Sequence, residues 1–181
     1  LESPVKKAAI RHGIPVLQPK NLKDPDFLEE LRTLRANLQV IVAFRMLPEA
    51  VWNMPELGTF NLHGSLLPKY RGAAPINWAI IRGEKETGVT SFFLQHEIDT
   101  GDLIFQESMP IHPDDTAGDV HDRMMHLGAE VVLKTVRAIA DESVTPQRQD
   151  DTRATSAPKL FSETCQVDFE KPVQIVHDFV R

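Results

Sequence analysis

The stretch that most restricts the possible fold is 38–44, a nearly unbroken run of apolar and β-branched residues, Leu-Gln-Val-Ile-Val-Ala-Phe. Such a run is typical of a central strand that is buried on both faces of a parallel sheet. A shorter apolar run at 14–17 precedes it, and between the two lies a helical pattern over 24–35 that begins with Asp24 as N-cap and Pro25 in the first turn. Strand, helix and strand in this order predict a right-handed crossover unit and an α/β protein.

The rest of the chain continues this alternation. Further helices are expected at 4–12, 48–53, 74–82, 116–140 and 172–180, and further strands at 59–62, 89–94 and 103–109, with a short one at 167–169. Thr116 opens the longest helix, and Asp119 is placed to complete a capping box. The predicted architecture is an open, mostly parallel sheet with helices on both faces.

Composition narrows the class of protein. A chain of 181 residues is long enough for one main domain with its own core, and no apolar run approaches the roughly 20 residues that cross a bilayer. The net charge of -6 disfavours direct binding of nucleic acid. The single cysteine, Cys165, excludes an internal disulfide and a Cys-rich metal site. We therefore expect a cytoplasmic protein with no membrane contact.

Polar groups gather where predicted strands end. Asn61 and His63 are two residues apart, so their side chains emerge on the same face of a strand. Asp99 lies in a tight turn between two later strands. A neutral amide can donate to a developing oxyanion, and a histidine near a carboxylate can carry a proton near neutral pH. These groups suit acyl-type transfer to an amine, for which no metal is required.

Other interpretations of the same residues stay open at this point. A histidine at a strand end is often structural, and an aspartate in a turn often serves as an Asx-turn residue. Ser65 beside His63 and Asp99 suggests a serine hydrolase, but the Gly-x-Ser-x-Gly elbow is absent. Nothing around Cys165 would lower the pKa of its thiol, so a catalytic thiol is poorly supported.

Three segments carry a more specific signal. They read Asn-Leu-His-Gly-Ser-Leu-Leu-Pro at 61–68, Tyr-Arg-Gly-Ala-Ala-Pro at 70–75 and Ile-Asp-Thr-Gly-Asp at 98–102. Together they resemble the signature of the folate-dependent formyltransferases. Further segments at 12–16, 86–90, 114–118 and 157–159 are also similar to that family, so the resemblance covers essentially the whole chain.

The resemblance implies a Rossmann-like domain that binds 10-formyltetrahydrofolate and needs no metal. Within the family the sequence is most similar to members that formylate the amino group of methionine on the initiator tRNA. Asn61, His63 and Asp99 match the catalytic trio. The implied roles are oxyanion stabilisation by Asn61 and a protonated His63, with Asp99 orienting the histidine and helping to move the proton.

The resemblance also implies which residues contact the folate. They are Ser65, Leu66, Leu67 and Pro68 in a loop along the folate, Arg45, Met46 and Leu47 in a pterin-contacting turn, and Leu94, Gln95, His96, Glu97 and Ile98 in the loop that closes the pterin pocket.

The sequence departs from the family pattern in two loops and at both ends. Gly64 stands where the family has Ala or Pro, and the turn 44–48 lacks the more common Tyr-Gly. The family's first strand would precede residue 1, and its carboxyl-terminal β-barrel would follow residue 181. We therefore expect a partial catalytic domain over 1–149 and a linker over 150–181, with initiator methionyl-tRNA bound mainly by regions outside this chain.

Two alternatives keep the fold and change the function. Folate-dependent enzymes with similar trios formylate amino-sugar nucleotides or glycinamide ribonucleotide, or hydrolyse the formyl group. The segment 71–75 argues against the glycinamide ribonucleotide acceptor but leaves the sugar nucleotide open. A folate-binding domain without activity is the non-enzymatic alternative.

Overall fold

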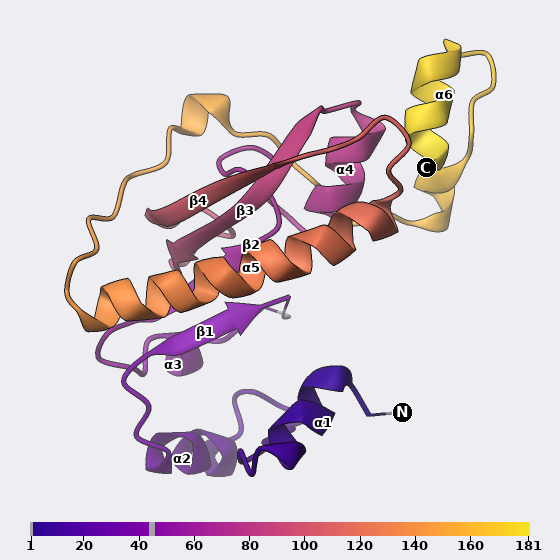
Figure 1. Ribbon diagram of the computed structural model, residues 1–181. Helices are drawn as coiled ribbons and strands as arrows, with labels where there is room; N and C mark the ends of the chain where they lie inside the picture. Colours follow the sequence, from indigo (N-terminus) through magenta and orange to yellow (C-terminus); the bar gives the residue numbers. More distant parts are fainter. Residues whose placement is uncertain (1, 44–45) are drawn as a thin grey trace.

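The computed structural model describes residues 2–43 and 46–181, and Figure 1 shows one sheet with a long helix across it. The elements in chain order are α1 (Pro4–Arg11), α2 (Pro25–Thr33), β1 (Gln39–Val42), α3 (Glu49–Trp52), β2 (Thr59–His63), α4 (Pro75–Ile81), β3 (Glu86–Phe93), β4 (Leu103–Pro110), α5 (Ala117–Ala140), the 3-10 turns η1 (Asp151–Arg153) and η2 (Ser162–Cys165), and α6 (Val173–Val180). Among the described helices, none has the length and apolar character to cross a membrane.

The sheet is open and mixed, with strand order β1-β2-β3-β4. The expected α/β architecture is confirmed, but of the described strand pairs only β1–β2 is parallel, whereas β2–β3 and β3–β4 are antiparallel. The sheet is thus not mostly parallel. The connection 94–102 between β3 and β4 is too short for the crossover that parallel strands need, so β4 must return beside β3 in the opposite direction.

Strand β1 lies at an edge of the described sheet, and the prediction of a strand buried on both faces is wrong. Val40 and Val42, which share one face of β1, are 38% and 54% exposed, and β1 pairs only with β2 among the described strands. The predicted strand at 14–17 does not form in the described chain, and Ile14 is exposed. The predicted crossover from 14–17 to 38–44 is therefore absent, and the parallel pair is instead joined through α3.

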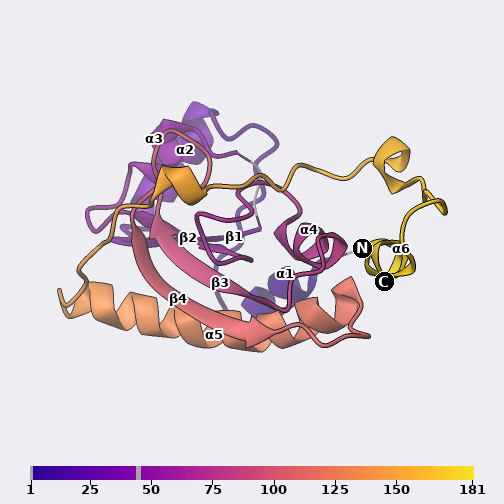
Figure 2. The same ribbon diagram turned by 90° about the horizontal axis from the view of Figure 1, so that it is seen from above.

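The core lies between the sheet and α5, which packs on β3 and β4. Figure 2 shows α5 along one side of the sheet and α3 on the opposite side, so helices flank both faces. The predicted capping box is present: Thr116 Oγ1 accepts from the Asp119 amide, and the Asp119 carboxylate accepts from the Thr116 amide. Buried core residues include Ala79, Ile80, Val89, Met109, Ile111, Val120, Met124 and Val131.

Beyond α5 the chain returns across the molecule before it reaches α6 (Figure 2). The helix predicted at 172–180 is present as α6 and packs on α4, whereas the short strand predicted at 167–169 is not formed. Residues 150–158, predicted as part of a linker, hydrogen-bond extensively to the loop that follows β2. The boundary predicted at 149 remains a prediction.

Candidate active site

Strand β2 carries the first two residues of the predicted site. It is fixed on both sides, with Asn61 opposite Ile41 of β1 and Phe92 of β3, and His63 opposite Thr90. His63 is only 7% exposed, whereas Asn61 is half-buried. Among the described residues no hydrogen bond of the Asn61 side-chain amide is found, and Asn61 lies two residues before His63 on the same strand.

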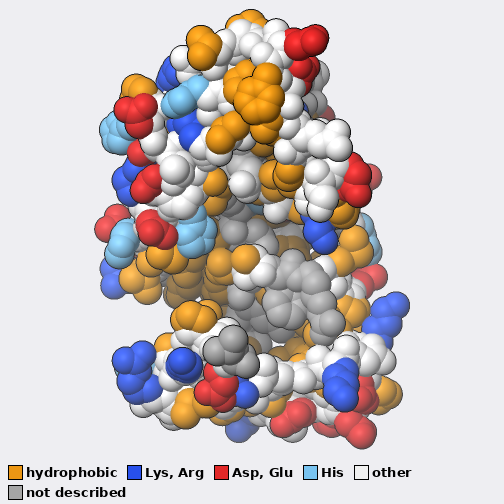
Figure 3. Space-filling model, turned by 90° about the vertical axis from the view of Figure 1, so that its right-hand side faces the viewer, with side chains coloured by type: hydrophobic (Ala, Val, Ile, Leu, Met, Phe, Trp, Pro, Cys, Tyr) orange, Lys and Arg blue, Asp and Glu red, His pale blue; other side chains and the backbone are white. Residues whose placement is uncertain are grey.

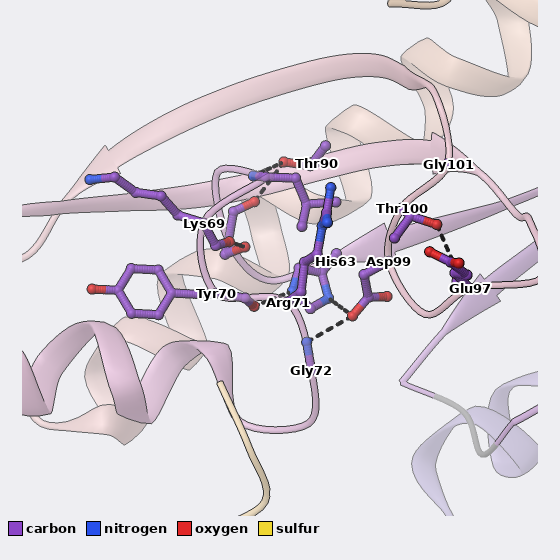
Figure 4. Close-up of polar contacts among 12 residues, drawn as sticks. His63, Lys69, Tyr70, Arg71, Gly72, Thr90, Glu97, Asp99, Thr100 and Gly101 are labelled. Atoms are coloured by element: carbon purple, nitrogen blue, oxygen red, sulfur yellow. Dashed lines mark hydrogen bonds and ion pairs between the residues drawn. The ribbon is translucent and has the colours of Figure 1, made fainter. Parts of the chain in front are cut away.

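The two ring nitrogens of His63 face different partners (Figure 4). Nε2 lies 2.8 Å from the carbonyl oxygen of Tyr70. A carbonyl can only accept, so Nε2 must carry a hydrogen. Nδ1 lies 3.7 Å from Oδ2 of Asp99, close enough for an ion pair and too far for a hydrogen bond. The ring is thus anchored through Nε2, and Nδ1 is left to exchange a proton with a third group.

Asp99 lies in the connection between β3 and β4, as predicted, and its carboxylate is 14% exposed. Its Oδ2 also accepts a hydrogen bond of 2.8 Å from the backbone N–H of Gly72. Asp99 has a φ of +57°, in the left-handed region that residues other than glycine seldom adopt. Backbone conformations of this kind persist where surrounding contacts hold them, and they concentrate at functional sites.

Tyr70 supports the site from the loop after β2. It too has a positive φ, +61°, and it is almost fully buried. While its carbonyl holds His63, its hydroxyl donates to Glu84 Oε1 at 2.7 Å. Burial and this hydrogen bond to Glu84 raise the pKa of Tyr70 to about 12. The Arg82 guanidinium, 5.1 Å from the ring centroid, opposes that rise.

The predicted folate loop 65–68 is turned largely inward. Ser65 is fully buried, and its hydroxyl donates to the carbonyl of Lys69 at 2.6 Å. The Leu67 amide donates to Thr90 Oγ1, and Thr90 in turn donates to the Ser65 carbonyl. Leu67 and Pro68 are also buried, and Leu66 is half-buried. The hydroxyl of Ser65 therefore shapes the loop, and contact of this loop with folate stays a prediction.

A pocket of about 710 Å³ opens beside the Asp99 turn. Four residues of the predicted pterin loop line it together with others, namely Trp52, Leu94, Gln95, His96, Glu97, Thr100, Asp102, Arg148, Gln149 and Asp151. The rings of Trp52 and His96 meet edge to face, with centroids 5.3 Å apart. The volume lies within the range of small-molecule sites. An aromatic wall with carboxylates nearby suits a flat heterocycle that bears N–H donors.

Three other residues predicted to contact folate are described by the structure. Ile98 is 61% exposed and Met46 is 76% exposed, while Leu47 is half-buried. None of the three is among the described residues that line the pocket. Arg45 lies outside the described residues.

The segment 155–158 binds the loop after β2 along its length. The Arg71 amide donates to the Thr155 carbonyl, and the Ala157 amide donates back to the Arg71 carbonyl. The Ala74 amide donates to the Ala157 carbonyl. Gly72 has a φ of +124°, and a Cβ there would lie 2.6 Å from the Ala157 oxygen. Glycine at position 72 lets these two segments approach.

Several groups of this site were not predicted from the sequence. The Tyr70 carbonyl and the Gly72 amide are backbone groups, and Gln149 lies in a polar stretch with no motif of its own. The only available signal was the match of 70–75 to a family signature. In the described part of the chain, no three His, Cys, Asp or Glu side chains are arranged to hold a metal ion.

Comparison with known families agrees with the geometry. A family model described as formyl transferase matches residues 1–136, and the chain belongs to this family. Among curated relatives, methionyl-tRNA formyltransferase of Azobacteroides pseudotrichonymphae genomovar. CFP2 is 57% identical, and that of Bacteroides thetaiotaomicron is 56% identical. Each alignment covers 99% of this chain and 57% of the relative. The chain thus spans little more than half the length of these relatives.

Solved structures show the same fold. An N-formyltransferase from Helicobacter canadensis, in complex with folinic acid and dTDP-3-aminofucose, has a TM-score of 0.79 at 23% identity over 100% of this chain and 65% of its own. WlaRD, a sugar 3N-formyl transferase, has a TM-score of 0.78 at 22% identity over 98% of this chain and 61% of its own. At these identities the likeness concerns the fold.

Proposed function

We propose that this chain forms the catalytic part of an enzyme that transfers the formyl group of 10-formyltetrahydrofolate to the amino group of methionyl-tRNA. The observation that carries the proposal is the approach of Asp99 to His63 at the end of the strand that also carries Asn61. The names of relatives that are 56–57% identical support the choice of acceptor. Such an enzyme acts in the cytoplasm, during translation initiation.

The residues present fit a folate-type donor. The pocket beside the Asp99 turn has an aromatic wall of Trp52 and His96 and carboxylates at Glu97 and Asp102. We assign the pterin to this pocket. When bound, the donor would supply an activated formyl carbon for the groups at the end of β2.

The proposed reaction forms a bond between the acceptor nitrogen and the formyl carbon and breaks the bond from that carbon to the folate nitrogen. Asn61 donates its amide hydrogens to the formyl oxygen as negative charge develops there. A protonated His63 donates from Nδ1 to the same oxygen, since Nε2 is held by Tyr70. Asp99 accepts the proton that the attacking amine loses, and that proton leaves with the departing folate nitrogen.

Most contacts with tRNA are assigned to regions outside this chain. The chain has a net charge of -6, and phosphate groups are bound chiefly by clustered Lys and Arg. The site itself needs to accommodate only the aminoacyl end.

The test compares acceptors and variants in the protein that the complete gene encodes. Release of tetrahydrofolate is measured with methionyl-tRNA and, separately, with an amino-sugar nucleotide. We expect turnover with methionyl-tRNA only, and His63→Ala should lower kcat by about 10²- to 10⁴-fold, the usual contribution of an acid-base group. Turnover with the sugar nucleotide alone would show that the sugar nucleotide, and not methionyl-tRNA, is the acceptor. Near-normal turnover by His63→Ala would refute the acid-base role proposed for His63.

A further inference from the structure

Gln149 lies in the wall of the pocket beside the Asp99 turn, and its side-chain amide is fully hydrogen-bonded. Its side chain is 5% exposed. Oε1 accepts from Arg71 Nε at 3.2 Å and from Arg71 Nη2 at 2.7 Å. Nε2 donates to the carbonyl oxygens of Asp99 at 2.9 Å and Gly101 at 2.7 Å. Arginine can only donate and carbonyls can only accept, so the orientation of the amide is determined by its partners.

The partners of this amide belong to the two loops that build the site (Figure 4). Arg71 lies between Tyr70, whose carbonyl holds His63, and Gly72, whose N–H donates to Asp99. Gly101 and Asp99 belong to the turn that presents the carboxylate. Gln149 therefore joins the loop that anchors His63 to the turn that carries Asp99, from a third segment beyond α5.

The turn needs such support because of its backbone. A left-handed conformation at Asp99 is unfavourable on its own and requires contacts that hold it. Gln149 supplies two of them, on the carbonyls on either side of Thr100. Arg71 also binds Asp151 at 2.7 Å, which ties the guanidinium to the same segment as Gln149.

We propose that Gln149 is a positioning residue for Asp99: it fixes the turn 99–101 relative to the His63 ring, with Arg71 as its anchor. The proposal rests on the proposed function for its catalytic consequence. The distance between Nδ1 of His63 and Oδ2 of Asp99 is then set by a hydrogen-bonded unit of three segments.

Two substitutions separate the halves of this unit. Gln149→Met keeps the length of the side chain and removes all four hydrogen bonds. Gln149→Glu keeps an acceptor for Arg71 and removes the donor to Asp99 and Gly101. The matched control is Gln147→Met, because Gln147 lies in the same segment and is exposed.

Kinetics are measured in the protein that the complete gene encodes, with KM determined for the donor and for the acceptor. Both Gln149 variants should lower kcat by about 10²-fold, the effect of misplacing a reacting group by an ångström, with a much smaller change in KM for the donor, whose proposed pocket Gln149 also lines. Gln147→Met should match the parent. A Gln149→Met protein with normal kcat would overturn the proposal, and so would a loss confined to KM for the donor. If Gln149→Met fails to fold, Gln149→Glu decides by the same criteria.

A double-mutant cycle tests whether the effect acts through Asp99. Asp99→Asn removes the carboxylate and keeps a residue that tolerates the left-handed conformation. In that background, Gln149→Met should cost little further activity, because residues that act as a unit are not additive. If the losses in kcat caused by Asp99→Asn and by Gln149→Met multiply in the double variant, the positioning role is refuted.

An NMR measurement separates failure of this inference from failure of the proposed function. The ¹H–¹³C signal of the His63 ring should shift in Gln149→Met and stay in place in Gln147→Met, with no substrate present. An unmoved signal in Gln149→Met would overturn the inference. A shifted signal in a protein that formylates no acceptor would support the inference and refute the proposed function.

Discussion

Tyr70 contacts two parts of the molecule, one through its backbone carbonyl and one through its hydroxyl. Its carbonyl holds the His63 imidazole, and its hydroxyl is fixed by Glu84, so the loop after β2 is tied to the region beyond α4. A shift of the Tyr70 ring would therefore be transmitted directly to His63. The buried hydroxyl offers a spectroscopic measure of this link, because the chain contains a single tyrosine.

The ionisation of Tyr70 gives a prediction at this scale. Burial and Glu84 raise the pKa of Tyr70 to about 12 in the folded protein, whereas the pKa of tyrosine in an unfolded chain is about 10. The folded state therefore keeps Tyr70 protonated to a higher pH than the unfolded chain does. The contribution of this difference to the free energy of unfolding is complete below about pH 10 and is lost as the pH rises through about 12. Ultraviolet titration of the tyrosinate should show a midpoint well above 10, and Glu84→Gln should lower it. A midpoint near 10, with circular dichroism still native, would contradict the packing described for Tyr70.

At the scale of single residues, the sequence indicates candidate side chains for the chemistry and misses the groups that hold them. Asn61, His63 and Asp99 were proposed from residue type, spacing and family resemblance, and the structure places the His63 ring and the Asp99 carboxylate side by side. The Tyr70 carbonyl and the Gly72 amide could not be found, because backbone groups have no sequence identity. Gln149 could not be found because its partners lie 50 and 78 positions away.

The elements of the site depend on the close packing of the loop after β2 against segment 155–158. This packing passes through Gly72, whose N–H reaches Asp99 while its Cα faces the Ala157 carbonyl. Any side chain at position 72 must displace one of these partners.

Gly72→Ala should therefore lower both stability and activity. The new Cβ would meet the Ala157 oxygen at 2.6 Å, and alanine is strained at a φ of +124°. We expect a loss of about 1–3 kcal/mol in the free energy of unfolding, measured with urea, together with a lower kcat. Gly118→Ala is the control, because its Cβ would meet only Thr116 Oγ1 at 3.5 Å in the first turn of α5. Equal stability of the two variants would refute the close approach.

At the scale of the whole molecule, the helices differ in how much of their surface is buried. Neither α1 nor α2 contributes a buried residue, whereas α5 buries residues along its whole length. Figure 3 shows the face that carries α1 below and α6 above, with a hollow between them. Exposed apolar side chains occur in both regions, including Val5, Ile10, Phe169 and Val173.

Hydrogen exchange should reveal this unevenness. In the 181-residue chain, amides of α1 and α2 should exchange by local opening, orders of magnitude faster than those of β3 and α5, because few apolar contacts oppose the opening. Mass spectrometry of peptides from each element measures the difference. Protection of α1 equal to that of α5 would show that the first helices belong to the same cooperative unit as the core.

The overall fold was predictable in its elements and less so in its sheet. Helical periodicity and caps located α1, α2 and α5, because these signals are local. The direction and order of strands depend on partners distant in sequence, so the run at 38–44 did not reveal that β1 lies at an edge or that β3 runs antiparallel to β2.

The contact between segment 155–158 and the loop after β2 also has a consequence for biosynthesis. The ribosome delivers a chain from its N-terminus, so residues 68–74 emerge long before the segment that binds them. The hydrogen bonds from Gln149 to the turn 99–101 and from Ala157 to the loop after β2 can form only when these later residues have emerged. A nascent chain that has already released Asn61, His63 and Asp99 therefore still lacks these contacts, and a ribosome stalled after α5 would display the candidate site without them.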